Sequence, residues 1–327
     1  MSIEIKTASI EPVRATFANI SRRFGEKAAT RYQEATYDIQ PEGNEHYRPL
    51  WDHDHEMVDA SRTQIVMRDW YDLKDPRQYY YGAYVQQRAK MQEIAEGNYS
   101  FFDKRNLAEL LTDDIKSRVI KYLVPLRHVE HTANLNNMFG CAYGFGTTLT
   151  QAFLYNGMDR LGMAQYLSRI GLLLDGNTGS ALAEAKQAWM EDPMWQGLRA
   201  LCESTLVVKD WFELFIAQNV VMDGLAAELF YRQFDQQLVA QGGQDIGMLT
   251  EFMREWEKDS NRWVDAVVKV TLAESDGNAQ LLRSWTELWR SKVAEAYQPI
   301  ADSILGSEGL NLCLAELDKR LTKLGLC

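Results

Sequence analysis

The sequence has few of the residues that most often carry chemistry or cross a membrane. It contains no CxxC pair, only five histidines in 327 residues, and no apolar run near the ~18 residues that span a bilayer. The net charge of -11 disfavours a nucleic acid or an anionic membrane as the main partner. Scattered cysteines and the lack of a secretory signal lead us to expect a cytoplasmic protein.

Proline is nearly missing from the middle of the chain. Five of the seven prolines lie in the first 125 residues, and only Pro193 lies between Pro125 and Pro299. Because proline blocks helix interiors, the middle of the chain can carry long helices, and no strand-hairpin signal competes with them. We therefore expect an all-α protein built as a bundle of long helices. The predicted helices cover about 78–96, 112–125, 180–190, 194–203, 209–241, 246–274, 279–299 and 309–323. The run 126–175 is also rich in helix formers, and its glycines Gly140, Gly144, Gly146 and Gly157 either end helices or let two helices approach closely.

The first part of the chain lacks periodicity but is rich in aromatic residues. A short helix fits residues 12–24, whereas residues 31–75 show no sustained helical or strand period. So long an irregular segment is expected to order along a partner. We predict two parts, a partner-wrapping N-terminal arm over 1–77 and a helical bundle over 78–327. The residues expected to contact a partner are Tyr47, Leu50, Trp51, Trp70, Tyr79, Tyr80 and Tyr81.

A bundle of long acidic helices raises the question of a di-iron centre. Such centres need a Glu from each of two helices and a Glu-x-x-His pair from each of two others. None of the five histidines follows a glutamate by three positions, and the nearest approach is Asp52-x-x-His55 in the arm. The sequence therefore predicts no catalytic residue, metal or cofactor in this chain.

Two weaker histidine clusters remain. Residues 52–56 read DHDHE, which we interpret as a solvated or partner-contacting loop rather than a metal site. His128 and His131 share a helix face and are interpreted as a hydrogen-bonded pair near a kink. The alternatives left open are an enzyme with its own metal site around His128 and His131, and a stand-alone helical binding protein.

Three segments carry a resemblance to a known family. Residues 75–93 read DPRQYYYGAYVQQRAKMQE, residues 47–51 read YRPLW and residues 98–102 read NYSFF. Together they resemble the β subunits of bacterial multicomponent monooxygenases, most of all those of the phenol hydroxylases. The resemblance extends over most of the chain and implies a ferritin-like bundle.

In that family the α and β subunits share the ferritin-like bundle, and only α carries iron. Residues 159–166 (DRLGMAQY) and 259–263 (DSNRW) resemble the two iron-binding helix patterns of α. On this resemblance the ligand slots of the first pattern hold Arg160 and Met163, and those of the second hold Ser260 and Trp263. The resemblance thus implies vestigial slots, empty of ligands.

The resemblance also implies a function. The chain would be the non-catalytic β subunit of a phenol 2-monooxygenase, assembled with a di-iron α subunit and a small γ subunit as an (αβγ)2 oxygenase. A regulatory protein and an NADPH-dependent reductase would act on this complex, which hydroxylates phenol and methylphenols with O2 in aromatic catabolism. The alternative within the family is the β subunit of a toluene or alkene monooxygenase.

Overall fold

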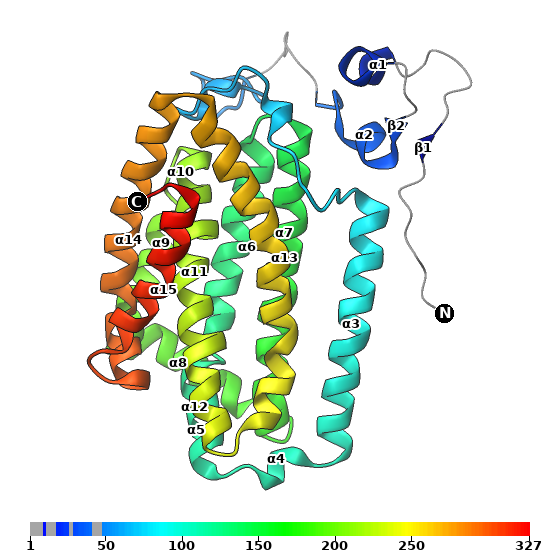
Figure 1. Ribbon diagram of the computed structural model, residues 1–327. Helices are drawn as coiled ribbons and strands as arrows, with labels where there is room; N and C mark the ends of the chain where they lie inside the picture. The colour runs from blue at the N-terminus through cyan, green and yellow to red at the C-terminus, as the bar shows by residue number, and fades with distance from the viewer. Residues whose placement is uncertain (1–8, 11–17, 26–28, 41–47) are drawn as a thin grey trace.

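The computed structural model describes residues 9–10, 18–25, 29–40 and 48–327, and within these ranges the chain is almost entirely helical. Long helices stand side by side as a bundle, with α3 on its outer side (Figure 1). The predicted all-α class is confirmed. The helices of the bundle are α3 (Tyr81–Lys104), α4 (Leu107–Leu110), α5 (Asp113–Tyr122), α6 (Leu126–Tyr143), α7 (Thr147–Leu174), α8 (Ser180–Glu191), α9 (Pro193–Thr205), α10 (Trp211–Phe215), α11 (Asp223–Ala226), α12 (Asp235–Ala240), α13 (Gln244–Glu274), α14 (Asp276–Leu305) and α15 (Gly309–Leu324).

Local sequence explains where many of these helices begin and end. The Thr112 side chain accepts a hydrogen bond from the Ile115 backbone N–H and caps α5, whose first turn holds two acids. Asp192 caps α9 in the same way, with Pro193 at the first helical position. Gly146, with φ of 91°, makes the break between α6 and α7 that a residue with a Cβ would strain.

Three features of the helices differ from the prediction. The helix predicted over 209–241 is continuous but contains two π-helical stretches, η4 (Ile216–Met222) and η5 (Ala227–Phe234). Helix α14 continues through Pro299, where we expected it to end, because Tyr297 and Ile300 pack fully inside the core and hold the last turns in place. Helix α3 likewise extends past the end predicted near residue 96 and ends at Lys104.

Helices α6 and α7 form the tightest pair, and glycines make that possible. A Cβ on Gly140 would lie 2.6 Å from the Phe153 ring, and one on Gly157 would overlap the end of the Met138 side chain. Both positions are inside helices, where glycine is otherwise unfavourable. The close approach of the two backbones accounts for them.

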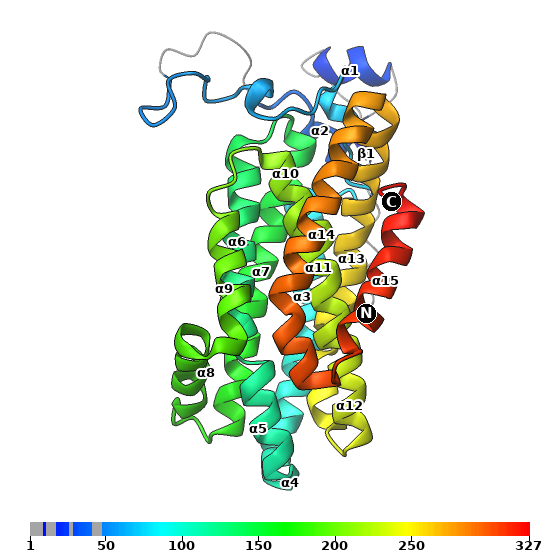
Figure 2. The same cartoon turned by 90° about the vertical axis from the view of Figure 1, so that its left-hand side faces the viewer.

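The N-terminal part packs on the bundle more closely than an extended arm would. It contains a two-residue antiparallel pairing of β1 (Ser9–Ile10) with β2 (Ala29–Thr30), and the short helices α1 (Ala18–Phe24) and α2 (Arg31–Thr36). Residues 48–80 then cross one end of the bundle (Figure 2). Ile65 and Leu73 are fully buried in the main core. Residues 65–73 are therefore an integral part of the bundle, although they precede the boundary predicted at residue 77.

No helix in the described ranges is long and apolar enough to cross a bilayer.

Candidate functional site

The centre of the bundle holds a buried ion cluster around Arg160. Its guanidinium Nη1 donates to Glu130 Oε2 of α6 at 2.8 Å, and its Nη2 contacts the Asp223 carboxylate of α11. The same group lies 4.3 Å from the ring centroid of Trp256, on α13. Only 4% of the Arg160 residue is exposed. One side chain of α7 thus ties four helical elements together.

Burial sets the protonation behaviour of this cluster. Desolvation raises the pKa of both Glu130 and Asp223, and the opposing positive charge of Arg160 lowers it only in part. Desolvation alone would lower the pKa of Arg160, but the negative charges of Asp223 and Glu130 raise it further above its usual value. The arginine therefore stays charged inside the protein.

The other three residues predicted in the ligand slots are buried as well. The Ser260 hydroxyl donates to Asn156 Oδ1 at 3.1 Å, and the Asn156 amide donates to side-chain oxygens on two further helices. Met163 and Trp263 are packed in the core, where the Trp263 ring meets the Phe153 ring edge to face at 5.3 Å. The four predicted ligand slots are therefore occupied by an arginine, by a hydroxyl that bonds to a series of asparagine side chains, and by apolar packing.

These residues do not fit a pair of iron ions. The cation of Arg160 already lies between the two carboxylates of the centre, and the facing slots offer a thioether, a hydroxyl and an indole. Across the described residues, no three or more His, Cys, Asp or Glu side chains gather as a metal-binding group. Di-iron carboxylate sites require four carboxylates and two imidazoles.

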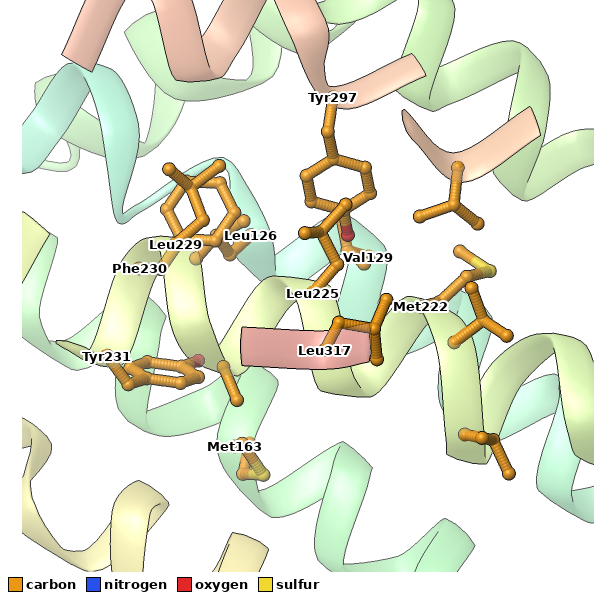
Figure 3. Packing of buried hydrophobic residues seen from close by; sticks show 14 of the residues in the cluster. Leu126, Val129, Met163, Met222, Leu225, Leu229, Phe230, Tyr231, Tyr297 and Leu317 are labelled. Atoms are coloured by element: carbon orange, nitrogen blue, oxygen red, sulfur yellow. The ribbon is translucent and has the colours of Figure 1, made fainter. Parts of the chain in front are cut away.

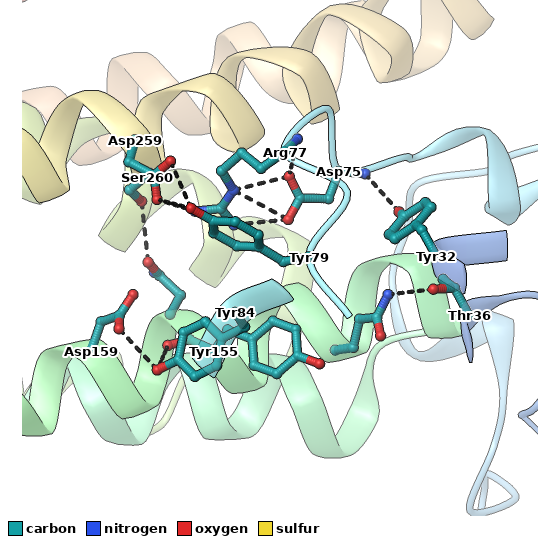
Figure 4. Close-up of polar contacts among 12 residues, drawn as sticks. Tyr32, Thr36, Asp75, Arg77, Tyr79, Tyr84, Tyr155, Asp159, Asp259 and Ser260 are labelled. Carbon is teal, nitrogen blue, oxygen red and sulfur yellow. Dashed lines mark hydrogen bonds and ion pairs between the residues drawn. The ribbon is translucent and has the colours of Figure 1, made fainter. Parts of the chain in front are cut away.

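A second ion network lies just outside this centre, on Asp159 and Asp259. Arg88 of α3 bridges them, with its Nη2 at 2.7 Å from Asp159 Oδ2 and 2.9 Å from Asp259 Oδ2. The Tyr84 hydroxyl donates to Asp159 at 2.9 Å, and the Tyr79 hydroxyl donates to Asp259 at 3.1 Å (Figure 4). We call Asp159, Asp259, Arg77 and Arg88 the latch, because they fasten residues 75–88 to α7 and α13.

The chain just before α3 is fixed by Arg77. Its guanidinium forms a buried ion pair with Asp75 at 2.9 Å and reaches Asp259 at 3.3 Å. Burial, reinforced by the charge of Asp259, raises the pKa of Tyr79 to about 12, so this hydroxyl remains a donor. The segment that carried the family resemblance is therefore built to hold itself onto the bundle.

The predicted partner-facing residues divide into two groups. Leu50 is 84% exposed, Trp51 is 69% exposed and Tyr81 is 74% exposed, although all three are apolar or aromatic. Trp70 and Tyr79 instead are buried in this chain's own core, which corrects their assignment to a partner-facing surface. They lie inside because the segment folds back onto the bundle end. Tyr80 is half-buried, and Tyr47 lies outside the described residues.

The loop around Trp51 is internally braced. The Trp51 indole N–H donates to the Tyr143 hydroxyl at 3.1 Å, and Arg62 lies over the same Tyr143 ring. Asp52 contacts both His55 and Arg62, and the His55 contact is the main reason that the pKa of Asp52 falls to about 2. The Asp52 carboxylate is therefore already paired with the positive charge of Arg62. The loop borders a groove of about 830 Å³.

The histidine pair on α6 does not converge on a common site. The His128 ring stacks on Trp189 at 5.5 Å between centroids, whereas His131 points to solvent. Burial lowers the pKa of His128 to about 4, and nearby positive charges contribute further. The pair therefore gives no support to a metal site at this position.

Sequence reasoning missed the acids that hold Arg160 and the latch role of Arg88. Neither Glu130 nor Asp223 was singled out from the sequence. The available signal was Arg160 itself, because a charged side chain in a helix as apolar as α7 requires buried partners.

Similarity to solved structures places this bundle in the ferritin-like helical class. The xenon-pressurised phenol hydroxylase structure from Pseudomonas sp. OX1 matches with a TM-score of 0.93 and 51% identity over 98% of both chains. A toluene 4-monooxygenase structure with bound toluene shares the fold, with a TM-score of 0.70, 20% identity and coverage of 77% of this chain and 82% of that chain.

The particular family follows from the sequence comparisons. Residues 51–275 match the methane/phenol/alkene hydroxylase family model. The phenol 2-monooxygenase oxygenase components MhpL of Acinetobacter pittii and DmpL of Pseudomonas sp. CF600 are each 52% identical over 100% of this chain and 98% of their own lengths. This chain belongs to the methane/phenol/alkene hydroxylase family, as its sequence resemblance predicted.

Proposed function

We propose that this chain is the non-catalytic β subunit of the oxygenase component of a phenol 2-monooxygenase. The observation that carries the proposal is the centre of the bundle, where Arg160 is held between Glu130 and Asp223. The curated relatives at 52% identity are phenol 2-monooxygenase oxygenase components. The subunit role is supported by a more distant relative, the β subunit of the toluene-4-monooxygenase hydroxylase from Ectopseudomonas mendocina, 23% identical over 72% of this chain and 73% of its own length.

In this proposal the chain contributes structure to an (αβγ)2 assembly. The α subunit would hold the di-iron centre and hydroxylate phenol or methylphenols, with electrons from NADPH supplied through a reductase and with a regulatory protein bound. Exposed Leu50, Trp51 and Tyr81 support the role of a partner surface, because large aromatic side chains dominate protein interfaces. The bracing of Trp51 through Tyr143 would present it in a fixed conformation and reduce the entropic cost of binding.

The test compares the lone chain with the assembled oxygenase. The chain would be purified alone, and α and γ would be purified with and without it. We expect no phenol oxidation and no stoichiometric iron in the lone chain, and recovery of turnover only when all three subunits are present with reductase and regulatory protein. Phenol oxidation by the lone chain, or full turnover by α and γ without it, would contradict the proposal.

A further inference from the structure

We propose that Arg160 keeps a divalent-cation site closed, and that the carboxylates holding its guanidinium group form that site once the arginine is removed. The inference rests on contacts within this chain and does not depend on the proposed function. It explains why a bundle centre with two converging carboxylates does not need a metal ion.

The first observation is the imbalance of charge around Arg160. Glu130 and Asp223 come from different helices, and both carboxylates contact the one guanidinium group. Two acids and one arginine carry a net charge of -1, whereas two acids and a divalent cation would be neutral. Buried carboxylates must be paired or must coordinate a metal, because an isolated buried charge is strongly unfavourable.

The second observation is a small cavity beside the guanidinium group. It has a volume of about 20 Å³, and its lining is largely apolar but includes Glu130, Arg160, Asp223, Tyr231 and Tyr297. Both tyrosine hydroxyls are buried without a hydrogen-bond partner, as is Arg160 Nε. Figure 3 shows the two tyrosine rings entering the core from different helices. The cavity thus offers two unused hydroxyl oxygens in addition to the carboxylates.

The donor set determines which cation the opened site would take. The side-chain oxygen atoms around it belong to carboxylates, tyrosine hydroxyls and the Gln218 amide, and no histidine or cysteine lines the cavity. Oxygen ligands suit hard cations such as Mn²⁺ or Mg²⁺. Shortening Arg160 to alanine would remove the competing positive charge and enlarge the cavity. In the natural chain the guanidinium group occupies the position between the carboxylates and repels a second cation.

The experiment is a Mn²⁺ titration of the full-length R160A variant, read by electron paramagnetic resonance and by metal analysis after desalting. We expect about one Mn²⁺ per R160A chain, and less than about a tenth of that in the natural chain and in R160K, which retains a positive charge. Addition of E130Q and D223N to R160A should abolish uptake. Mn²⁺ should raise the melting temperature of R160A and leave that of the natural chain unchanged.

Growth with and without added Mn²⁺ covers the case in which R160A is unstable without metal. The cation should then restore soluble R160A, because it replaces the lost positive charge. Three results would overturn the inference: a folded R160A chain that takes up no Mn²⁺, uptake that survives E130Q and D223N, or R160A that stays insoluble even with Mn²⁺ present.

Discussion

Two neighbouring residues of α7, Asp159 and Arg160, anchor two ion networks that serve different purposes. Arg160 turns inward and joins helices of the bundle to one another through Glu130 and Asp223. Asp159 turns toward α3 and accepts hydrogen bonds from Arg88, Tyr84 and the Trp256 indole. The inner network holds the bundle together, and the latch attaches residues 75–88 to its outside.

The two networks also differ in how well their charges are compensated. The inner carboxylates share one buried guanidinium group, and Asp223 also accepts a hydrogen bond from the Gln218 amide. In the latch, two arginines are shared among three carboxylates, and two tyrosine hydroxyls and an indole N–H donate further hydrogen bonds. Removal of one latch contact therefore leaves other charged partners in place. Loss of Arg160 leaves two buried carboxylates without an arginine in contact with them. An arginine–carboxylate ion pair is therefore expected to contribute more to the free energy of unfolding in the inner network than in the latch.

The largest expected effect is that of R160M, which retains bulk and removes the charge. It should lower the free energy of unfolding by about 3–5 kcal/mol, because breaking a buried pair leaves uncompensated charge. Chemical denaturation of the full-length chain measures this change. Adding E130M and D223L should restore most of the loss, since an apolar set of similar size requires no counter-charge. If the free energy of unfolding of R160M lies within about 1 kcal/mol of that of the natural chain, the inner network stabilises the fold no more than the latch does.

A smaller effect is expected at the latch from D259N. It weakens charged hydrogen bonds from Arg77, Arg88 and Tyr79 and should cost about 1.5–3 kcal/mol. Hydrogen exchange should speed up over 75–90 and remain slow in the interior of α7. D265N on the same helix, which loses an outer pair with Arg320, is the matched control. Equal acceleration in the α7 interior would show that the latch also holds the bundle.

The bundle could be predicted from sequence because its signals are local. Proline scarcity predicted long helices, and the helix starts predicted near residues 112 and 180 agree with the structure within a few residues. The passage of α14 through Pro299 could not be foreseen, because tertiary packing of Tyr297 and Ile300 overrides the local preference. The π-helical stretches carry no signal that we recognised.

The candidate site was predictable only in part. The four slot residues were identified through the family resemblance, but the acids around Arg160 lie 30 residues before it and 63 after it along the chain. Such pairings depend on which helix faces meet. Trp70 and Tyr79 were expected to face a partner, yet both turn inward, because aromatic content alone does not distinguish a core from an interface.

The outer surface is probed by W51A, which tests the proposed contact with the α subunit. The fold should change by less than about 0.5 kcal/mol, since the ring is mostly exposed. Binding to α should weaken by about 2 kcal/mol, roughly 30-fold, if the ring is an interface anchor. Analytical ultracentrifugation or calorimetry measures the binding. L312A, at an exposed position on α15, is the control; equal binding by W51A and L312A would remove Trp51 from the proposed surface.

The pH dependence of stability separates His128 from both ion networks. Burial lowers its pKa from 6.5 to about 4, with contributions from Arg127, His131 and Lys186. Between these pH values the unfolded chain binds a proton that the folded chain does not, so stability should fall as pH falls through this window. H128F should flatten this part of the stability profile, and H131Q at the exposed neighbouring position should not. An unchanged slope in H128F would assign the acid sensitivity to groups other than His128.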